Sequence, residues 1–377
     1  MKAVLQSEIY PLSLMKKLLV ATGGGDCPGL NAVIRGIVKR ASRESDWEVW
    51  GCFEAFNGIM EDPIRVVRLD EKAVGGIHVQ GGTILGTTNK GNPMSFPEKQ
   101  PDGTVKTINK IPWLVDRFKS NGFDAVINIG GDGSQAISQA LFEAGMPVVG
   151  VPKTIDNDLS STDFTFGFQT AVQTATDSFD RLVTTANSHH RVMIMEVMGR
   201  NAGWIALYTA IAGGAEICLI PEIPYDLNKV IEKIKSRYNN GRGFVNIVIA
   251  EGAKAKDGTI TSTKGEEGRM AVRLGGVCFT LSQQLKDAGL EADVRETVLG
   301  HTQRGGTPVA FDRVIASVFG VKAMELILEE KYGQLVVLKN NDFSSVSIKE
   351  AISEYNFVDP LGTLVQSAKG LGIAFGD

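Results

Sequence analysis

Two short segments of this chain combine glycines, carboxylates and a lysine in a pattern that suits phosphate chemistry. Residues 130–134 read Gly-Gly-Asp-Gly-Ser and directly follow an apolar run, whereas residues 152–158 read Pro-Lys-Thr-Ile-Asp-Asn-Asp. Glycines at the end of a buried strand let backbone N–H groups approach an anion, and a carboxylate such as Asp132 can hold a divalent cation on that anion. The second segment adds Asp156 and Asp158 beside a lysine and a threonine, which supply a base, a metal contact and a hydroxyl donor. Together the segments indicate phosphoryl transfer.

Length and composition set the broad class. At 377 residues the chain exceeds the usual size of a single core, so we expect two domains with a cleft between them. A net charge of −4 gives no overall attraction to nucleic acid or membrane, and we expect neither as a partner. The four cysteines lie far apart without a Cys-x-x-Cys pair, which favours reduced thiols in the cytoplasm over a zinc site or a redox pair.

The first residues of the chain do not have the pattern of a targeting segment. Residues 1–14 lack the continuous apolar core of a signal peptide, and we interpret them as an N-terminal extension. No run approaches the roughly 18 apolar residues that a membrane-spanning helix needs.

Segments typical of strands and helices alternate along most of the chain. The expected strands are residues 17–21, 47–53, 125–129, 146–151, 191–197, 216–220 and 244–250, and the expected helices are residues 32–41, 134–144, 201–213, 226–239 and 270–288. This alternation predicts parallel sheets in a doubly wound α/β arrangement, in which ligands bind beyond the carboxyl ends of the strands. The glycine loops fall at those ends. Residues 254–269 are polar and weakly patterned, so we expect a surface loop or hairpin there.

A second strand, glycine loop and helix unit lies near the N-terminus. Residues 24–26 read Gly-Gly-Asp and repeat the pattern of residues 130–132. No Gly-Lys-Ser/Thr follows, so this is not a Walker A loop. Alone, the turn could simply be a tight strand-to-helix connection, and Gly-Gly-Asp-Gly is shared by several unrelated kinase families. Two phosphate-binding turns would account for both segments.

At six ordered sites the sequence resembles the 6-phosphofructokinase family, from about Lys16 to about Glu330. The matching segments are residues 24–31 (Gly-Gly-Asp-Cys-Pro-Gly-Leu-Asn), 81–86 (Gly-Gly-Thr-Ile-Leu-Gly), 130–134, 152–158, 196–200 (Glu-Val-Met-Gly-Arg) and 299–306 (Leu-Gly-His-Thr-Gln-Arg-Gly-Gly). The resemblance implies an α/β fold of two doubly wound Rossmann-like lobes with the active site in the cleft between them. The larger, nucleotide-binding lobe would comprise residues 15–165 plus about 303–350. The smaller, sugar-phosphate-binding lobe would comprise about 166–302 plus 351–377.

The resemblance also implies a reaction, the Mg²⁺-dependent transfer of the γ-phosphoryl group of ATP to the 1-hydroxyl of fructose 6-phosphate in glycolysis. Asp156 matches the base that takes the proton from that hydroxyl, with Thr154 and Asp158 shaping the reacting centre. Asp132 matches the Mg²⁺ ligand, and Arg200 matches the cation that neutralises the transferred group. These roles agree with the physics of phosphoryl transfer, which needs positioning, a metal and positive charge more than a strong base.

The implied binding residues form two sets. Those for ATP lie in the glycine loops and just after residue 86: Gly24, Gly25, Asn89, Lys90, Gly131, Asp132, Gly133 and Ser134. Those for the sugar phosphate are Thr154, Ile155, Asp156, Arg191, Met198, Gly199, Arg200, Glu251, Arg295, His301, Thr302, Gln303 and Arg304. Taken alone, Arg191 and Arg295 would more often be solvated surface charges, and His301 a structural histidine. In the family, the residues matching Arg191 and Arg295 reach a neighbouring subunit's site, which implies a homo-oligomer, a dimer or tetramer, with shared active sites.

The choice of phosphoryl donor rests on a mixed signature. In the family, a glycine at Gly133 goes with ATP, because an aspartate there crowds and repels the α-phosphate. Lys153 stands where the common bacterial ATP enzymes have glycine and pyrophosphate enzymes have lysine, whose ammonium can meet the terminal phosphate of the donor. Asn89 replaces an arginine that common bacterial members use on the donor phosphates, and Lys90 would substitute in part. An aspartate at the position of Gly133 would exclude ATP, whereas the cation at Lys153 is compatible with either donor. Gly133 therefore outweighs Lys153, and we expect ATP as the phosphoryl donor, with pyrophosphate as the alternative.

Two readings from other classes explain less of the sequence. A regulatory subunit that binds sugar phosphate without catalysis should have lost its base or its metal ligand, and this chain retains both. An NAD or lipid kinase would share only residues 130–133, which leaves residues 152–158 and 299–306 without an explanation.

Control by phosphorylated effectors is expected to be weak. Common bacterial members carry an arginine near the end of the helix at residues 177–186, and the resemblance assigns it to their effector pocket. Here Val183 stands at that position. A lost ion pair of this kind would cost an effector about 1.5–3 kcal/mol. We therefore expect little response to ADP or phosphoenolpyruvate.

Overall fold

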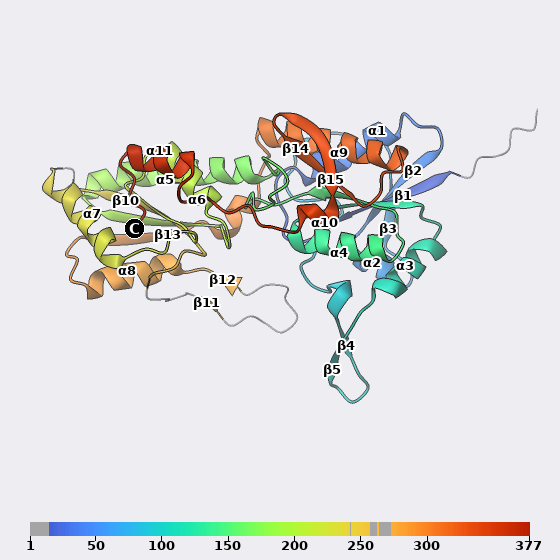
Figure 1. The fold of residues 1–377 in the computed structure, drawn as a ribbon, viewed down its shortest axis with the longest axis horizontal. Coiled ribbons are helices and arrows are strands. Elements are labelled where there is room, and N and C mark those ends of the chain that lie inside the picture. Colours follow the sequence, from blue (N-terminus) through green and yellow to red (C-terminus); the bar gives the residue numbers. More distant parts are fainter. Residues whose placement is uncertain (1–14, 242, 257–261, 264–272) are drawn as a thin grey trace, which may run out of the picture.

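The computed structural model describes residues 15–241, 243–256, 262–263 and 273–377. Two α/β layered units lie side by side along the long axis, each built around its own sheet (Figure 1). The expected α/β class with two lobes is thus confirmed. Within the described ranges, no helix is both long enough and apolar enough to span a membrane.

The larger sheet has the strand order β15-β14-β7-β6-β1-β2-β3. Its strands are β1 (Lys16–Thr22), β2 (Trp47–Cys52), β3 (Val66–Leu69), β6 (Ala125–Gly130), β7 (Val148–Pro152), β14 (Gln334–Lys339) and β15 (Asp342–Ser347). Helices α1 (Leu30–Ala41) and α9 (Ala310–Leu328) cover one face, and α2 (Asn57–Met60), α3 (Ile111–Ser120), α4 (Asp132–Glu143) and α10 (Ile348–Ala351) cover the other. Successive residues of β1 alternate between these layers, Leu18 toward the first and Leu19 toward the second. This is why the central strands read as continuous apolar runs.

The edges of this sheet depart from the parallel arrangement that we expected. Strand β3 pairs antiparallel with β2, and β15 pairs antiparallel with β14. Only Asn340 and Asn341 join β14 to β15, and both have positive φ, 51° and 63°. A two-residue loop with positive φ at both positions makes a tight hairpin, whereas a parallel connection needs a long crossover. The strand-and-helix rhythm could not reveal these edge strands.

The smaller sheet is entirely parallel, with the order β13-β8-β10-β9. Its strands are β8 (Val192–Val197), β9 (Ile217–Leu219), β10 (Val245–Ala250) and β13 (Val294–Val298). Helices α5 (Phe168–His189), α6 (Trp204–Gly213) and α11 (Thr363–Gly370) lie on one face, and α7 (Leu227–Asn239) and α8 (Val277–Asp287) on the other. The C-terminal segment leaves the larger lobe after α10 and ends beside this sheet (Figure 1).

The expected helix at residues 270–288 begins later than predicted. Helix α8 starts at Val277, after Gly275 and Gly276 with φ of 135° and 86°, values that exclude helical continuation. Before these glycines, β12 (Arg273–Leu274) pairs with β11 (Ser262–Thr263). Most of the predicted loop at residues 254–269 lies outside the described residues.

The remaining elements are short. Strands β4 (Phe96–Lys99) and β5 (Val105–Ile108) form a hairpin that projects from the larger lobe (Figure 1). In the described part of the chain, 3₁₀ turns cover Ile77–Val79, Pro93–Ser95 and Gly300–Arg304.

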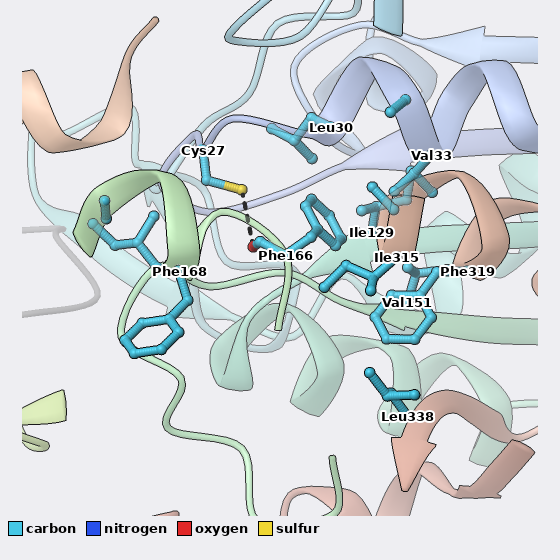
Figure 2. Packing of buried hydrophobic residues seen from close by; sticks show 14 of the residues in the cluster. Cys27, Leu30, Val33, Ile129, Val151, Phe166, Phe168, Ile315, Phe319 and Leu338 are labelled. Atoms are coloured by element: carbon cyan, nitrogen blue, oxygen red, sulfur yellow. Dashed lines mark hydrogen bonds between the residues drawn. The ribbon is translucent and has the colours of Figure 1, made fainter. Parts of the chain in front are cut away.

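A buried aromatic cluster supports the segment that leads from the larger lobe into α5. Phe166 is fully buried and meets Phe319 of α9 edge to face, with 6.4 Å between ring centroids. The carbonyl of Phe166 accepts a hydrogen bond from the Cys27 Sγ–H at 3.6 Å (Figure 2). The loop after β1 and the start of α5 are therefore fixed to the same core, and both lead directly to the cleft described below.

Helices α1 and α9 pack with their backbones close together at Gly36 and Gly320. A Cβ atom on Gly36 would lie 2.5 Å from the Ser317 carbonyl oxygen and 3.2 Å from the Gly320 Cα. Side chains at this crossing would push the helices apart and loosen the core beneath them.

We expect Gly36→Ala to lower the free energy of unfolding by about 1–3 kcal/mol, because overpacking at a rigid backbone contact outweighs the better helix propensity of alanine. Urea denaturation followed by circular dichroism would measure the change. The matched control is Gly370→Ala in α11, where an added Cβ meets nothing within 4 Å and no loss is expected. Equal stability of the two variants would contradict the packing argument.

Candidate active site

The glycine loops lie at the topological switch point of the larger sheet. Strand β1 lies between β2 and β6, so the chain leaves β1 toward one edge of the sheet and leaves β6 toward the other. The loops that follow β1 and β6 diverge at their carboxyl ends and leave a crevice, the usual ligand position in such sheets. The segment after β7, which carries the Thr154–Asp158 turn, borders the same crevice.

Three neighbouring strands of the smaller sheet complete the cleft from the opposite side. Arg200 follows β8, Glu251 follows β10, and His301 follows β13. These strands are parallel and adjacent, so the residues beyond their carboxyl ends meet at one edge.

The resulting cleft has a volume of about 610 Å³. It is lined by Gly24, Gly25, Asp26, Thr87, Thr88, Asn89, Lys90, Gly131, Asp132, Gly133, Ser134, Lys153, Thr154, Asp156, Asp158, Met198, Arg200, Asn201, Glu251, His301 and Arg304. Every residue that the resemblance assigned to catalysis or to ATP binding lies on this lining. Segments from both lobes thus meet around a single space.

The Thr154–Asp158 turn is held in an unusual backbone conformation. Asn157 has φ of 52°, and its side-chain Oδ1 accepts a hydrogen bond from the Thr165 backbone N–H at 2.9 Å. The Thr165 hydroxyl in turn donates to the Thr154 carbonyl at 2.7 Å. A non-glycine residue keeps a positive φ at a cost that surrounding contacts must offset. Fixing Asn157 in this way sends Asp156 and Asp158 into the cleft on either side of it.

Burial dominates the electrostatics of the two carboxylates. Loss of hydration raises the pKa of Asp156 to about 6, although the nearby Arg304 guanidinium opposes that rise. Burial also raises the pKa of Asp158 to about 7, and the negative charge of Asp156 raises it further. Two carboxylates whose ionised forms are disfavoured at this point are typical of a site that moves a proton or awaits a cation.

The loop after β1 closes tightly against two cations. Arg304 Nη1 donates to the Asp26 carbonyl at 3.2 Å, and a Cβ on Gly25 would lie 2.8 Å from the same nitrogen. The Lys153 ammonium donates to the Gly25 carbonyl, and its side chain is only 4% exposed. Burial lowers the pKa of Lys153. A side chain at position 25 would therefore displace the Arg304 guanidinium from the Asp26 carbonyl.

The wall formed by the smaller lobe depends on a buried glutamine. Gln303 is fully buried, and its side-chain Oε1 accepts a hydrogen bond from the Met198 backbone N–H at 2.8 Å. The Glu251 N–H donates to the Val197 carbonyl at 2.9 Å, which places its side chain at the end of β10, where burial raises the pKa of Glu251. Gln303 thus supports the Met198–Arg200 wall from behind, and this role was not foreseen.

Several of the expected sugar-phosphate residues do not line the cleft. Ile155 is fully buried and Thr302 bonds to the Leu299 carbonyl, while Gly199 supports the wall only through its backbone. Arg191 and Arg295 share Asp293 instead, with Nε to Oδ2 at 2.7 Å and Nη1 to Oδ1 at 2.5 Å. Arg191 precedes β8 and Arg295 is the second residue of β13, so both lie at the strand ends away from the cleft and do not reach it within one chain.

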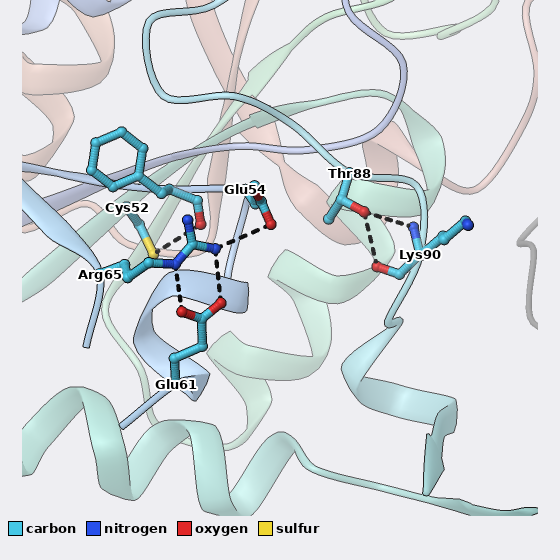
Figure 3. A network of polar contacts seen from close by, with 7 residues as sticks. Cys52, Glu54, Glu61, Arg65, Thr88 and Lys90 are labelled. Atoms are coloured by element: carbon cyan, nitrogen blue, oxygen red, sulfur yellow. Dashed lines mark hydrogen bonds and ion pairs between the residues drawn. The ribbon is translucent and has the colours of Figure 1, made fainter. Parts of the chain in front are cut away.

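A small hollow adjoins the cleft on the side of the larger lobe. It is lined by Gly23, Gly24, Ala55, Phe56, Asn57, Thr88, Lys90, Gly91, Asn92, Pro93, Asn128, Ser134 and Ile137. The turn at Glu54 beside it has φ of 54° and is held by Arg65, which pairs with Glu54 at 3.1 Å and with Glu61 (Figure 3). Thr88 and Lys90 lie across from this network (Figure 3). The hollow therefore continues the cleft beyond the glycine loops.

Sequence reasoning missed some residues of this region. Thr87 and Thr88 join their loop to the loop after β1 by two hydrogen bonds. Thr87 Oγ1 donates to the Gly24 carbonyl at 2.7 Å, and the Gly24 N–H donates to the Thr88 carbonyl at 3.0 Å. Their position next to Asn89 was an available signal. Tyr355 donates to Asp132 Oδ2 at 2.7 Å, and nothing in the sequence linked positions so far apart.

The residues of the cleft fit a magnesium ion carried by a phosphate ligand. Within the described ranges, no three His, Cys, Asp or Glu side chains form a group able to hold a metal alone. Mg²⁺ bound with substrate phosphates needs only one or two carboxylates and keeps several waters. Asp132 supplies such oxygens, and the buried Oδ1 atoms of Asp156 and Asp158 have no hydrogen-bond partner in the described part of the chain. Asp132 is the residue that would hold the ion.

Comparisons with known proteins identify the family of this chain. A profile of the Phosphofructokinase family matches residues 17–327. The chain is 46% identical to ATP-dependent 6-phosphofructokinase 2 of Clostridium perfringens, covering 96% of this chain and 99% of that protein. It is 45% identical to ATP-dependent 6-phosphofructokinase 1 of a Synechocystis species, with the same two coverages.

Solved structures show the same fold. The crystal structure of Pichia pastoris phosphofructokinase in the T-state superposes with a TM-score of 0.73 at 27% identity, over 95% of this chain and 37% of that one. A pyrophosphate-dependent phosphofructokinase from Marinobacter aquaeolei gives 0.77 at 20% identity, over 96% of this chain and 92% of that one. At that identity the second likeness concerns the fold alone.

The raised pKa of Asp158 predicts a stability effect that depends on pH. Because ionisation is less favourable in the folded state, the folded protein loses stability as pH rises from about 4 through the raised pKa. We expect Asp158→Asn to raise Tm by about 2–4 °C at pH 8. The gain should shrink toward pH 4, where both states are protonated. Calorimetry at both pH values would measure it, with Asp116→Asn on the exposed side of α3 as the control. A gain that is the same at both pH values would contradict the argument.

Proposed function

The chain belongs to the phosphofructokinase family, and we propose that its cleft transfers the γ-phosphoryl group of ATP to the 1-hydroxyl of fructose 6-phosphate, giving fructose 1,6-bisphosphate and ADP. It is an enzyme, a phosphotransferase that uses ATP. One observation carries the proposal: the Thr154–Asp158 turn, both glycine loops and Arg200 line a single cleft.

Each group in the cleft has a role in this reaction. Asp156 accepts the proton of the 1-hydroxyl group. The oxygen of that hydroxyl bonds to the γ-phosphorus, and the bond from the γ-phosphorus to the ADP oxygen breaks. Arg200 lines the cleft from the smaller lobe, where its positive charge offsets the charge on the transferred group. Asp132 would hold Mg²⁺, which supplies further positive charge on the donor phosphates when it is bound.

We propose that the larger lobe binds the nucleotide and the smaller lobe the sugar phosphate, with the boundaries expected from the sequence. In support, the strands of the seven-stranded sheet all fall within residues 15–165 and 303–350, and those of the four-stranded sheet within residues 166–302. Helix α11 packs with α6 of the smaller lobe, which supports assigning residues 351–377 there. Met198, Glu251, His301 and Arg304 would contact the sugar phosphate within one chain.

The alternative donor, pyrophosphate, is not favoured. The Lys153 ammonium donates to the Gly25 carbonyl, so its charge supports the loop after β1. In support of ATP, the relatives that match this chain over nearly its full length at 46% and 45% identity are ATP-dependent 6-phosphofructokinases. Gly133 leaves the cleft open at the first turn of α4.

Parallel assays of the purified protein test the donor. Formation of fructose 1,6-bisphosphate is measured with Mg²⁺, saturating fructose 6-phosphate and either ATP or pyrophosphate. We expect turnover with ATP and little with pyrophosphate. Efficient turnover with pyrophosphate and none with ATP would overturn the proposal.

We further propose a homo-oligomer in the cytoplasm with shared active sites. In support, Arg191 and Arg295 lie together on Asp293, away from the cleft of their own chain, and would serve the cleft of a second copy. All four cysteines are buried free thiols, as expected in a reducing compartment.

We expect Asp156→Ser to lower kcat at least about 10²-fold while leaving the affinity for fructose 6-phosphate nearly unchanged, since the variant loses the base and keeps the binding wall. Steady-state kinetics and equilibrium binding of fructose 6-phosphate would separate the two effects. Asp116→Ser, outside the cleft, should retain full activity. A kcat close to that of the unmodified protein would remove Asp156 from the mechanism.

Sugar saturation curves should respond little to ADP or phosphoenolpyruvate. Val183 lies on α5, where it is partly buried against the core and offers no charge to a phosphate. Initial rates against fructose 6-phosphate concentration, with and without each effector, would measure the response. A strongly sigmoidal curve that ADP makes hyperbolic would refute this expectation.

A further inference from the structure

The segment Tyr355–Val358, which we call the strap, follows α10 and links the Thr154–Asp158 turn to the smaller lobe. On one side the strap is bonded to the Thr154–Asp158 turn and to Leu159, which follows it. Tyr355 forms an antiparallel bridge with Leu159, and the Asn356 backbone N–H donates to the Asp158 carbonyl at 2.9 Å. The Asn356 side-chain Nδ2 donates to the Asn157 carbonyl at 2.9 Å. The strap therefore adds an edge to the turn that carries both buried carboxylates.

On its other side the strap is bonded to the smaller lobe. Trp204 Nε1, at the start of α6, donates to the Asn356 carbonyl at 2.7 Å. The Val358 N–H donates to Glu222 Oε1 at 2.9 Å, and Glu222 also accepts from the Gly203 N–H. Backbone bonds in both directions leave the strap little freedom to slide, so its side chains have defined positions.

Tyr355 uses that position to hold the carboxylate of Asp132. Its hydroxyl donates to Asp132 Oδ2 at 2.7 Å. Asp132 is the exposed first residue of α4, and within the described part of the chain its side chain has no other hydrogen-bond partner. An exposed aspartate without such a bond exchanges between rotamers. The bond therefore selects one orientation and leaves Oδ1 free.

We propose that Tyr355 is a positioning residue for the divalent cation of the phosphoryl transfer, acting through Asp132. The inference rests on the proposed function, because Asp132 is the residue that would hold the ion. Partners behind a metal ligand orient it, and their removal typically weakens metal binding by about 10–100-fold. Since the strap also holds Asn157 and Asp158, it fixes the metal-holding carboxylate relative to the turn that carries the base.

The conservative variant Tyr355→Phe separates this role from packing. It removes the hydroxyl and keeps the ring, which lies 5.8 Å from the ring of Phe357. Tyr238→Phe is the matched control, because it also removes a hydroxyl bond, to the His190 carbonyl at 2.8 Å, and Tyr238 does not line the cleft.

The decisive measurement is binding of adenylyl imidodiphosphate, an ATP analogue that is not turned over, by calorimetry with Mn²⁺ and with EDTA. We expect Tyr355→Phe to weaken binding of the Mn²⁺ complex about 10-fold, to leave metal-free binding unchanged, and to raise the Mg²⁺ concentration for half-maximal activity. Tyr238→Phe should change neither. In an Asp132→Asn background, Tyr355→Phe should have no further effect on the Mn²⁺ complex.

Three results would overturn the inference: unchanged binding of the Mn²⁺ complex, equal weakening with and without metal, or an undiminished effect in the Asp132→Asn background. Because these measurements need no turnover, they are separate from the donor assay. Failure of the unmodified protein to phosphorylate fructose 6-phosphate would count against the proposed function instead.

Discussion

Burial of two carboxylates on one short turn is the constraint on which the rest of this site depends. Desolvating Asp156 and Asp158 is unfavourable, and the turn persists because its backbone is bonded from several directions. Thr165 holds it from the core side, and the strap holds it from the solvent side. Directly after Thr165 comes Phe166, which anchors the turn to the aromatic core. The stability of the core thereby offsets the free energy that Asp156 and Asp158 lose when their carboxylates are removed from water.

The sheets decide which segments can share the cleft. Parallel strands present their carboxyl ends at a common edge, and the reversal of strand order between β1 and β6 opens a crevice there. The smaller sheet faces this crevice with the carboxyl ends of β8, β10 and β13. Loops more than a hundred residues apart in sequence therefore contribute to one space, and each loop can be short.

The loop after β1 lies close to two basic side chains. Gly25 lies against the Arg304 guanidinium, and the Lys153 ammonium donates a hydrogen bond to the Gly25 carbonyl. The buried Lys153 ammonium and the partly buried Arg304 guanidinium each donate to a backbone carbonyl, and these bonds offset part of their mutual repulsion. Lys153 follows β7, and Arg304 ends the 3₁₀ turn that follows β13, so the loop after β1 is bonded to segments that follow both sheets.

The sequence by itself determined the strand-and-helix order, the two glycine loops and the identity of the chemical groups, because apolar periodicity and short motifs are local properties. It also placed Asp132, Asp156 and Arg200 in one site through the family resemblance. Local pattern could not reveal the antiparallel edge strands, the late start of α8 or the pairing of Arg191 and Arg295 on Asp293. Nor could it reveal that Tyr355 meets Asp132, since that bond joins the last part of the chain to α4. Such contacts depend on how the two lobes pack and where the chain crosses between them, and only the tertiary structure decides that.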